Sequence, residues 1–334
     1  MMKWSTNLFR TSCLARAAAT AMGFLSVAPA AAAEPVVIGI GFATPLIGPH
    51  GAGAKAFKDE LERLSPGRFK IQLYPAAALG GEREMVESLQ LGNLQIAVTG
   101  TAVIGNFVPD LMVLDMPFMF RDSTHARAVL DGVVGQDLLA KFKPRGLVGL
   151  TFGEIGFRQI TTTKRIVTTP DTMKGLKIRT MENPVHLAAF RALGAQPTPM
   201  SWAEVVTSLQ QGTIDAQENP LSIIVASKLW ETQKHLTLSK HAFTAIAFTM
   251  SPSVFDNLLP ADQENIRKAA IVGRTANRQY VDEVEKAGVE EVRKHGMQVV
   301  TEVDLTAYRK QLEPVYKQYG ARFGSVMTRI AAVK

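Results

Sequence analysis

Cysteine is almost missing from this sequence. The only cysteine among the 334 residues is Cys13, and it lies in an N-terminal stretch, residues 1–33, that has the pattern of a secretory signal. That pattern consists of a basic start, a short alanine-rich apolar core at residues 17–27 and three alanines before Glu34. Cleavage there would leave a chain with no disulfide, no thiolate nucleophile and no zinc-binding cysteine. A secreted chain without disulfides points to the bacterial periplasm.

Strong charge and long apolar runs are missing as well. The formal net charge is +7, and it falls to +4 when the three basic residues of the signal, Lys3, Arg10 and Arg16, are removed. No basic run with interleaved aromatic residues occurs, so nothing suggests a nucleic-acid partner. No later segment reaches the roughly 20 apolar residues that a membrane-spanning helix needs. We expect a soluble mature protein, whose length of about 300 residues usually divides between two lobes.

Catalytic motifs are also missing. The chain has neither a GxSxG nucleophile elbow nor an HExxH zinc motif, and its six histidines show no metal-ligand spacing. The lone GxG at residues 39–41 lacks the third glycine of a dinucleotide fingerprint. Glu82 and Glu84 precede or begin a helical stretch, where they favour the helix dipole more than acid–base chemistry. We therefore expect no enzyme, no metal site and no cofactor.

Strands and helices alternate in the first part of the mature chain. Short runs of strand-forming residues at 36–40, 68–74 and 95–99 are separated by helical stretches at 54–64 and 82–91. This alternation predicts a mostly parallel sheet covered by helices, with ligands at the carboxyl ends of the strands. The loops after the three strands are therefore the expected cleft wall of this part, and the residues predicted to represent them at the ligand are Phe42, Ala78 and Thr101.

Three later segments bear on the architecture. Residues 108–120 are unusually apolar, which favours buried core over the alternative of an apolar cleft rim. Residues 236–250 contain a long strand-forming run that could pass from one lobe to the other. Residues 260–294 read as helix, and a continuous helix there would be about 50 Å long. The alternative is a break at Gly273 or Gly288.

The stretch from Lys174 to Pro220 is the most informative. It predicts a strand at 176–181, a helix at 184–193 that stops at Gly194, a second helix and a second strand at 213–217. Ser201 and Glu204 have the spacing of a capping box at the start of the second helix. Three residue types suited to ligand contact stand at the ends of these elements, namely Arg179, Trp202 and Asn219.

Arg179 is the sharpest single candidate. A guanidinium inside a sheet covered on both faces needs a partner, because an unpaired buried charge is costly. A ligand carboxylate fits the planar guanidinium fork. The alternative is a structural ion pair with Glu182 or Glu218, and from the residues alone we favour that ion pair.

The other candidates also have two interpretations each. Arg158, beside Phe157, is either a ligand clamp or a surface charge, and we favour the surface. Trp202 is either a packed aromatic residue or a pocket wall. Asn219 is held extended by Pro220 and is either a turn residue or an amide that binds a ligand.

Two strings within this stretch, GLKIRTMENPVH and GAQPTPMSWAEVVTSLQQGTIDAQENP, resemble the solute-binding proteins of the tripartite ATP-independent periplasmic (TRAP) transporters, the dicarboxylate-binding-protein (DctP) family. Four further strings agree in order along the mature chain: ALGGEREMVESLQLGNLQIAV, LDMPFMFRD, GFRQIT and LLPADQ. The resemblance implies an α/β fold of two lobes with mixed sheets, crossing hinge strands and a long lobe-spanning helix. The lobe boundaries that we expect are 34–155 plus 245–285 and 156–244 plus 286–334.

The resemblance also implies a function. Such a protein is a periplasmic receptor that closes its cleft on an organic acid and delivers it to the small and large membrane subunits of a TRAP permease; we expect a monomer. The family's carboxylate-binding arginine matches Arg179, its second arginine matches Arg158, its helix-start aromatic matches Trp202 and its QENP asparagine matches Asn219. From this match we place Arg179 at the ligand rather than in an ion pair.

Two departures from the family pattern bear on the ligand. Gly81 stands where the sialic-acid binders have an acidic residue, which argues against a sugar acid. Glu182 stands where those binders have an asparagine, and it could receive a ligand hydroxyl, amine or protonated acid, or pair with an arginine. C4 dicarboxylates, 2-oxo acids and aromatic or cyclic acids remain the candidates. Two other functions stay open from the residues, a secreted enzyme acting on a carboxylic acid and a ligand-sensing module for a membrane receptor.

Overall fold

The strands of the computed structural model, which describes residues 34–334, form one ten-stranded mixed sheet. The predicted signal, residues 1–33, lies outside the described residues. In chain order the strands are β1 (Val36–Gly41), β2 (Phe69–Tyr74), β3 (Ile96–Gly100), β4 (Val148–Thr162), β5 (Lys177–Thr180), β6 (Gln196–Pro199), β7 (Ala216–Pro220), β8 (His235–Thr237), β9 (Phe243–Met250) and β10 (Gln298–Val300).

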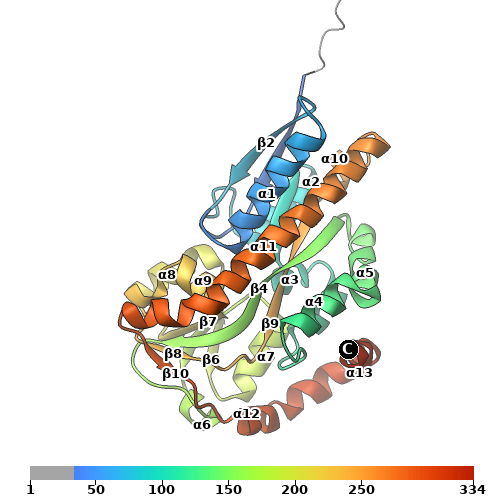
Figure 1. The fold of residues 1–334 in the computed structure, drawn as a ribbon. Coiled ribbons are helices and arrows are strands. Elements are labelled where there is room, and N and C mark those ends of the chain that lie inside the picture. Colours follow the sequence, from blue (N-terminus) through green and yellow to red (C-terminus); the bar gives the residue numbers. More distant parts are fainter. Residues whose placement is uncertain (1–33) are drawn as a thin grey trace, which may run out of the picture. The chain divides into compact units, whose positions relative to one another are not determined.

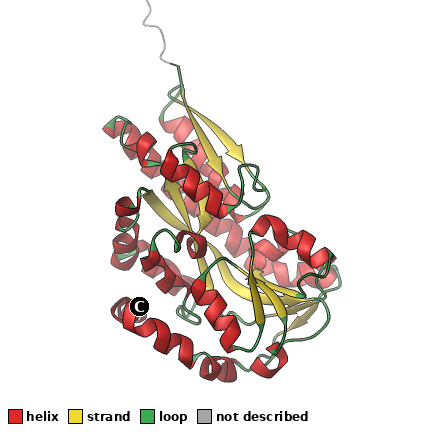
Figure 2. Cartoon of the chain, turned by 180° about the vertical axis from the view of Figure 1, so that it is seen from behind, coloured by secondary structure: helices red, strands yellow, loops and turns green. Residues whose placement is uncertain are grey.

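Helices cover this sheet on both sides (Figure 2). The α-helices are α1 (Pro49–Leu64), α2 (Glu82–Leu91), α3 (Thr101–Ile104), α4 (Ser123–Asp131), α5 (Val133–Ala140), α6 (Pro170–Met173), α7 (Pro184–Ala192), α8 (Trp202–Gln210), α9 (Leu221–Ala226), α10 (Pro252–Phe255), α11 (Pro260–Lys294), α12 (Leu305–Gln311) and α13 (Glu313–Ala332). Three 3-10 helices are η1 (Pro109–Asp115), η2 (Lys143–Arg145) and η3 (Leu229–Glu231). Within the described residues no helix is long and apolar enough to cross a membrane.

The sheet has two halves that meet at β9 and β4. The strand order is β2-β1-β3-β9-β4-β7-β5-β6. Off this order, β8 pairs with β4, and β10 pairs with β8. β1 pairs parallel with β2 and β3, as the strand–helix alternation predicts, and β5 pairs parallel with β6 and β7. The pairs β3–β9, β4–β9 and β4–β7 are antiparallel, so the predicted mixed α/β class is confirmed.

Strand β4 connects the two halves by changing partners. Its register with β9 runs from Val148 to Phe157, and its register with β7 begins at the next residue, Arg158, opposite Pro220. A β-bulge lies just before this point, between Glu154 and Gly156. Arg158 therefore stands at the junction of the two halves, which explains why the chain buries it.

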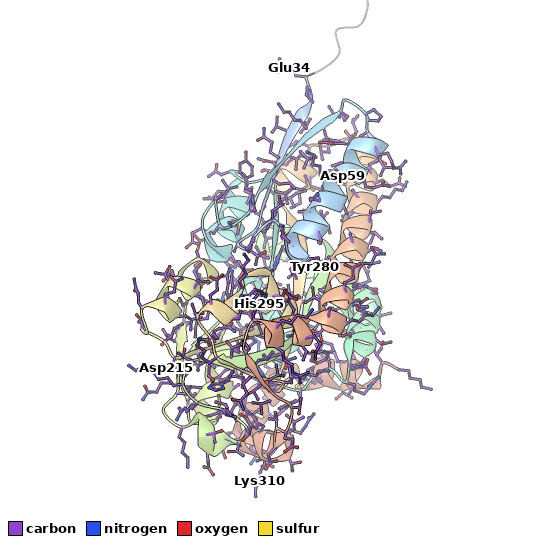
Figure 3. The ribbon with its side chains drawn as sticks, turned by 60° about the vertical axis from the view of Figure 1, so that its left-hand side comes forward. Glu34, Asp59, Asp215, Tyr280, His295 and Lys310 are labelled. Atoms are coloured by element: carbon purple, nitrogen blue, oxygen red, sulfur yellow. The ribbon has the colours of Figure 1, made fainter. Side chains whose placement is uncertain are left out.

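Helix α11 is continuous from Pro260 to Lys294, so the long helix is confirmed and the alternative of a break at Gly273 or Gly288 is excluded. It packs on α1, β4 and α9 and thereby touches elements of both halves (Figure 1). Figure 3 shows Tyr280 within this helix and His295 beyond its last turn. Gly273 serves close packing, because a Cβ atom there would lie 2.8 Å from the carbonyl oxygen of Gly53 in α1.

The apolar segment 108–120 is core, as favoured, because Leu111, Val113 and Met116 are fully buried. The predicted capping box of α8 is wrong, since the Ser201 side chain makes no capping hydrogen bond. The backbone N–H of Glu204, which that motif would use, donates to the Ser201 carbonyl oxygen instead (3.1 Å). The predicted stop after α7 is confirmed, with Gly194 at φ 85°.

Candidate ligand-binding site

A small cavity of about 20 Å³ lies where strand ends and helix starts of the two halves meet. The first half contributes the loop after β1, the first turns of α1 and α2 and the last residue of β3, whereas the second half contributes β5, β7 and the first residue of α8. The cavity thus lies at the carboxyl ends of strands, where the ligand was expected. The lining residues are Ala43, Thr44, His50, Glu82, Gly100, Ile155, Arg179, Met181, Trp202, Asn219 and Ile223.

Arg179 lies in the cavity wall and is 97% buried, with 3% of its surface exposed. Its Nε and Nη2 atoms both donate to the carbonyl oxygen of Met200, at 2.9 and 2.7 Å, which fixes the plane of the guanidinium. The Trp202 ring lies beside it, with the Arg179 Cζ atom 5.6 Å from the ring centroid. Burial lowers the pKa of Arg179 to about 10, so the group is still positively charged at neutral pH.

The ion pair of Arg179 with Glu182 or Glu218, which the residues alone favoured, does not form. No carboxylate oxygen of residues 34–334 lies within 4.0 Å of the Arg179 guanidinium nitrogens. Glu182 pairs instead with Arg83, at 3.6 Å, and Glu218 pairs with Arg158. A buried cation at a cavity wall without a protein carboxylate is suited to an anionic ligand.

Arg158 is fully buried, so the expectation of a surface charge is wrong. Its Nε and Nη2 atoms bind the two carboxylate oxygens of Glu218, the second at 2.8 Å, and its Nη1 atom donates to Thr244 Oγ1 at 3.0 Å. Burial alone would raise the pKa of Glu218, but the Arg158 charge and the His241 hydrogen bond outweigh burial and hold that pKa well below its ordinary value. Arg158 therefore ties β4 to β7 behind the cavity and is not part of the lining.

Buried polar groups extend this ion pair away from the cavity. His241 Nε2 lies 3.2 Å from Glu218 Oε2, and His241 Nδ1 lies 2.8 Å from Ser239 Oγ. His186 lies between Glu218 and Asp115. Its Nδ1 atom is 3.9 Å from Glu218 Oε1, and its Nε2 atom is 3.7 Å from Asp115 Oδ1. Burial raises the pKa of Asp115 to about 8 and lowers that of His186 to about 3, so both are neutral near pH 7. Arg158 and Glu218 are thus the paired charges at the centre of this buried network.

The residues predicted for the first half of the wall are close to the cavity but do not line it. Phe42 is fully buried in the core, Thr101 is fully buried with its hydroxyl donating to the Ala245 carbonyl at 3.0 Å, and Ala78 is exposed in its loop. The loops after β1 and β3 do reach the cavity, through Ala43, Thr44 and Gly100, whereas the loop at 76–81 contributes no lining residue.

Sequence reasoning missed three polar lining residues, Thr44, His50 and Glu82. Glu82 was assigned to the helix dipole, yet its Oε1 atom accepts a hydrogen bond from Gly100 N–H at 2.7 Å in the cavity wall. Burial raises the pKa of Glu82 and lowers that of His50 to about 4. The position of Glu82 directly after two glycines at a loop–helix junction was a usable signal for a cavity residue.

Stability below pH 6.5 tests the burial of His50. In the unfolded chain the His50 imidazole takes up a proton near pH 6.5, whereas in the native protein it stays neutral down to about pH 4. The contribution of neutral His50 to the unfolding free energy is therefore complete above pH 6.5 and is lost as the pH falls toward 4. We expect the unfolding free energy of the wild type to drop between pH 7.5 and pH 5 by about 2 kcal/mol more than that of His50→Gln. Urea unfolding at both pH values measures this. An equal drop in both proteins would place His50 in solvent.

Comparison with known proteins identifies the family. The family model for bacterial extracellular solute-binding protein, family 7 (DctP), matches residues 41–322. A TRAP periplasmic solute-binding protein from a Polaromonas species, solved with bound D-erythronate, has a TM-score of 0.88 and 43% identity, over 90% of this chain and 99% of that one. Its counterpart from Bordetella bronchiseptica, with density assigned to pantoate, has a TM-score of 0.87 and 45% identity over the same shares.

A more distant relative carries the family's name. The C4-dicarboxylate-binding periplasmic protein DctP of Rhodobacter capsulatus is 34% identical over 321 residues, which are 95% of each chain. The match therefore includes both halves of the sheet and the whole cavity wall. This chain belongs to bacterial extracellular solute-binding protein family 7, the DctP family of TRAP solute-binding proteins.

Proposed function

We propose that this protein is the periplasmic receptor of a TRAP transporter and binds a small organic acid through its carboxylate. The observation that carries the proposal is the Arg179 guanidinium, which is buried at the cavity wall with no protein carboxylate within 4.0 Å among the described residues. A ligand carboxylate completes its charge and its hydrogen bonding. Family membership supports the same assignment.

Two neighbouring groups complete the carboxylate end of the site. The Asn219 amide donates from Nδ2 to Gln217 Oε1 at 2.7 Å, which orients its Oδ1 atom for a ligand donor. The Trp202 ring covers the Arg179 guanidinium and forms an apolar wall. We assign Arg158 an indirect role, because its ion pair with Glu218 holds β7, and therefore Asn219, against β4.

The size of the cavity supports closure of two lobes on the ligand. A cavity of about 20 Å³ holds about one water molecule, so an organic acid enters only when the walls separate. We propose that residues 34–155 and 245–285 form one lobe and residues 156–244 and 286–334 the other. The crossing strands β4 and β9 and helix α11 would then act as the hinge, and the ligand would shift the population toward the closed form.

Contacts between the proposed lobes occur beside the cavity. The Arg83 Nε atom of α2 lies 3.6 Å from a Glu182 carboxylate oxygen, and Asn106 donates to the Glu182 carbonyl oxygen at 2.6 Å. Glu182 thus acts in our proposal as a closing contact between lobes. Phe42, Ala78 and Thr101 support the wall from behind or from its rim without touching the ligand.

The remaining parts of the proposal concern the cell. Residues 1–33 direct export and are cleaved, and the mature monomer docks in its closed form on the small and large membrane subunits. The relatives reported above are named for binding and not for catalysis. We propose no enzymatic activity, and the relatives with D-erythronate and pantoate lead us to withdraw the argument against sugar acids that Gly81 suggested.

Calorimetric titration of the purified mature protein with D-erythronate, pantoate, succinate, pyruvate and pyroglutamate tests this proposal. We expect saturable binding of one molecule of at least one acid, and recovery of that acid unchanged after prolonged incubation. No binding across the panel, or conversion of the bound acid to a product, would contradict it.

A further inference from the structure

The cavity wall that faces Arg179 is polar. Thr44, His50 and Glu82 belong to the loop after β1 and the first turns of α1 and α2, whereas Arg179 belongs to β5 in the other half of the sheet. The site therefore has two chemically different ends: the carboxylate end at Arg179 and a polar end across the cavity from it. The family's known ligands include hydroxy acids and C4 dicarboxylates, so family membership does not say which class this second end accepts.

Two atoms in this wall need a hydrogen-bond partner. Thr44 and His50 are 6% and 3% exposed, and Thr44 Oγ1 and His50 Nδ1 have no hydrogen-bond partner among the described residues. Buried polar atoms are nearly always hydrogen-bonded, because an unsatisfied one loses its interaction with water. A ligand that carries hydroxyl groups supplies both partners, since a hydroxyl donates one hydrogen bond and accepts others.

Glu82 makes the wall selective. Its Oε1 atom is held by Gly100 N–H at 2.7 Å. Its Oε2 atom accepts no hydrogen bond within residues 34–334. Glu82 and Arg179 line the same cavity without forming an ion pair within 4.0 Å, so a ligand that enters when the walls separate can contact both of them.

We propose that Thr44, His50 and Glu82 form a hydroxyl-binding wall, and that Glu82 makes the protein select a hydroxylated monocarboxylate over a C4 dicarboxylate. A hydroxyl at that end donates to the free oxygen of Glu82, whereas a second carboxylate is acceptor-only and has no proton to donate to that oxygen. The inference rests on the proposed function, because it takes the ligand carboxylate to be held by Arg179.

Glu82→Gln tests the inference with two acids of equal carbon number, D-erythronate and succinate. The amide keeps an acceptor for Gly100 N–H but removes the negative charge, so the fold should be unaffected. We expect the wild type to prefer D-erythronate. In the variant we expect D-erythronate affinity to fall at least about tenfold and succinate affinity to rise about tenfold.

Two further variants make the test specific. Glu84→Gln changes an exposed carboxylate two residues along the same helix, and both affinities should stay within twofold of the wild type. Thr44→Val removes a hydroxyl from the wall at nearly constant shape, and it should weaken D-erythronate binding without weakening succinate binding. Thermal melting of each variant verifies folding.

The outcomes distinguish a failure of the hydroxyl-binding wall from a failure of the proposed function. A wild type that prefers succinate, or a Glu82→Gln variant whose ratio of the two affinities stays within twofold of the wild type, would overturn the hydroxyl-binding wall and leave the organic-acid receptor intact. A wild type that binds no carboxylate would overturn the proposed function itself.

Discussion

Arg179→Ala is expected to lower the affinity for the organic acid at least about 100-fold. Truncation of one partner of a buried, hydrogen-bonded charge pair costs about 2–5 kcal/mol, and each 1.4 kcal/mol corresponds to a factor of ten. The ligand carboxylate would lose its cation and remain buried beside Glu82 and the polar wall. Calorimetric titration of wild type and variant with the tightest-binding acid measures the loss.

Two further variants control this prediction. Arg191→Ala removes an exposed arginine from the last turn of α7 and should leave affinity unchanged. Arg179→Lys keeps the charge but loses the planar fork that now donates twice to the Met200 carbonyl, so it should recover only part of the affinity. If Arg179→Ala binds within a few-fold of wild type, the carboxylate lies elsewhere.

Glu218→Ala is expected to have the largest effect on stability. Arg158 and Glu218 are both fully buried, and removal of one member of a buried ion pair leaves the other charge without compensation. Such changes cost about 3–5 kcal/mol of unfolding free energy. Urea unfolding at pH 7.5 measures the difference, which should far exceed that of any exposed carboxylate in the same half of the sheet.

The matched control is Glu204→Ala on the exposed side of α8, for which a change within about 0.5 kcal/mol is expected. The double variant Arg158→Met with Glu218→Leu removes both charges and should recover much of the loss, because an apolar pair of similar volume needs no compensation. A Glu218→Ala protein that unfolds within 1 kcal/mol of the wild type would show that Arg158 has another partner.

Local patterns predicted most of the secondary structure. The strands β1, β2 and β3, the stop of α7 at Gly194 and the long α11 follow from spacing, propensity and glycine position, all of which are local. Arg179 could be placed on its strand. Its position relative to Glu182 and Glu218 could not be predicted, because this position depends on the strands with which β4 and β7 pair. The burial of Arg158 has the same origin, since β4 changes partner at that residue.

The wall opposite Arg179 was the least predictable part of the site. Two of the three predicted loops supply residues to the cavity, but which residue of each loop reaches it depends on where the loop leaves its strand, and a shift of one residue exchanges Phe42 for Ala43 and Thr101 for Gly100. Glu82 is held at the cavity by a hydrogen bond from the backbone N–H of Gly100, which lies on strand β3, 18 residues along the chain. Such contacts between distant segments leave no periodic signal in the sequence.

A crystal structure of the mature protein with D-erythronate would show whether Arg179 binds the ligand carboxylate. We expect the ligand carboxylate to lie within about 3 Å of the Arg179 guanidinium. We also expect a ligand hydroxyl to contact the Glu82 carboxylate. A carboxylate bound by any other group, with Arg179 still bound only to the Met200 carbonyl, would contradict the proposed role of Arg179.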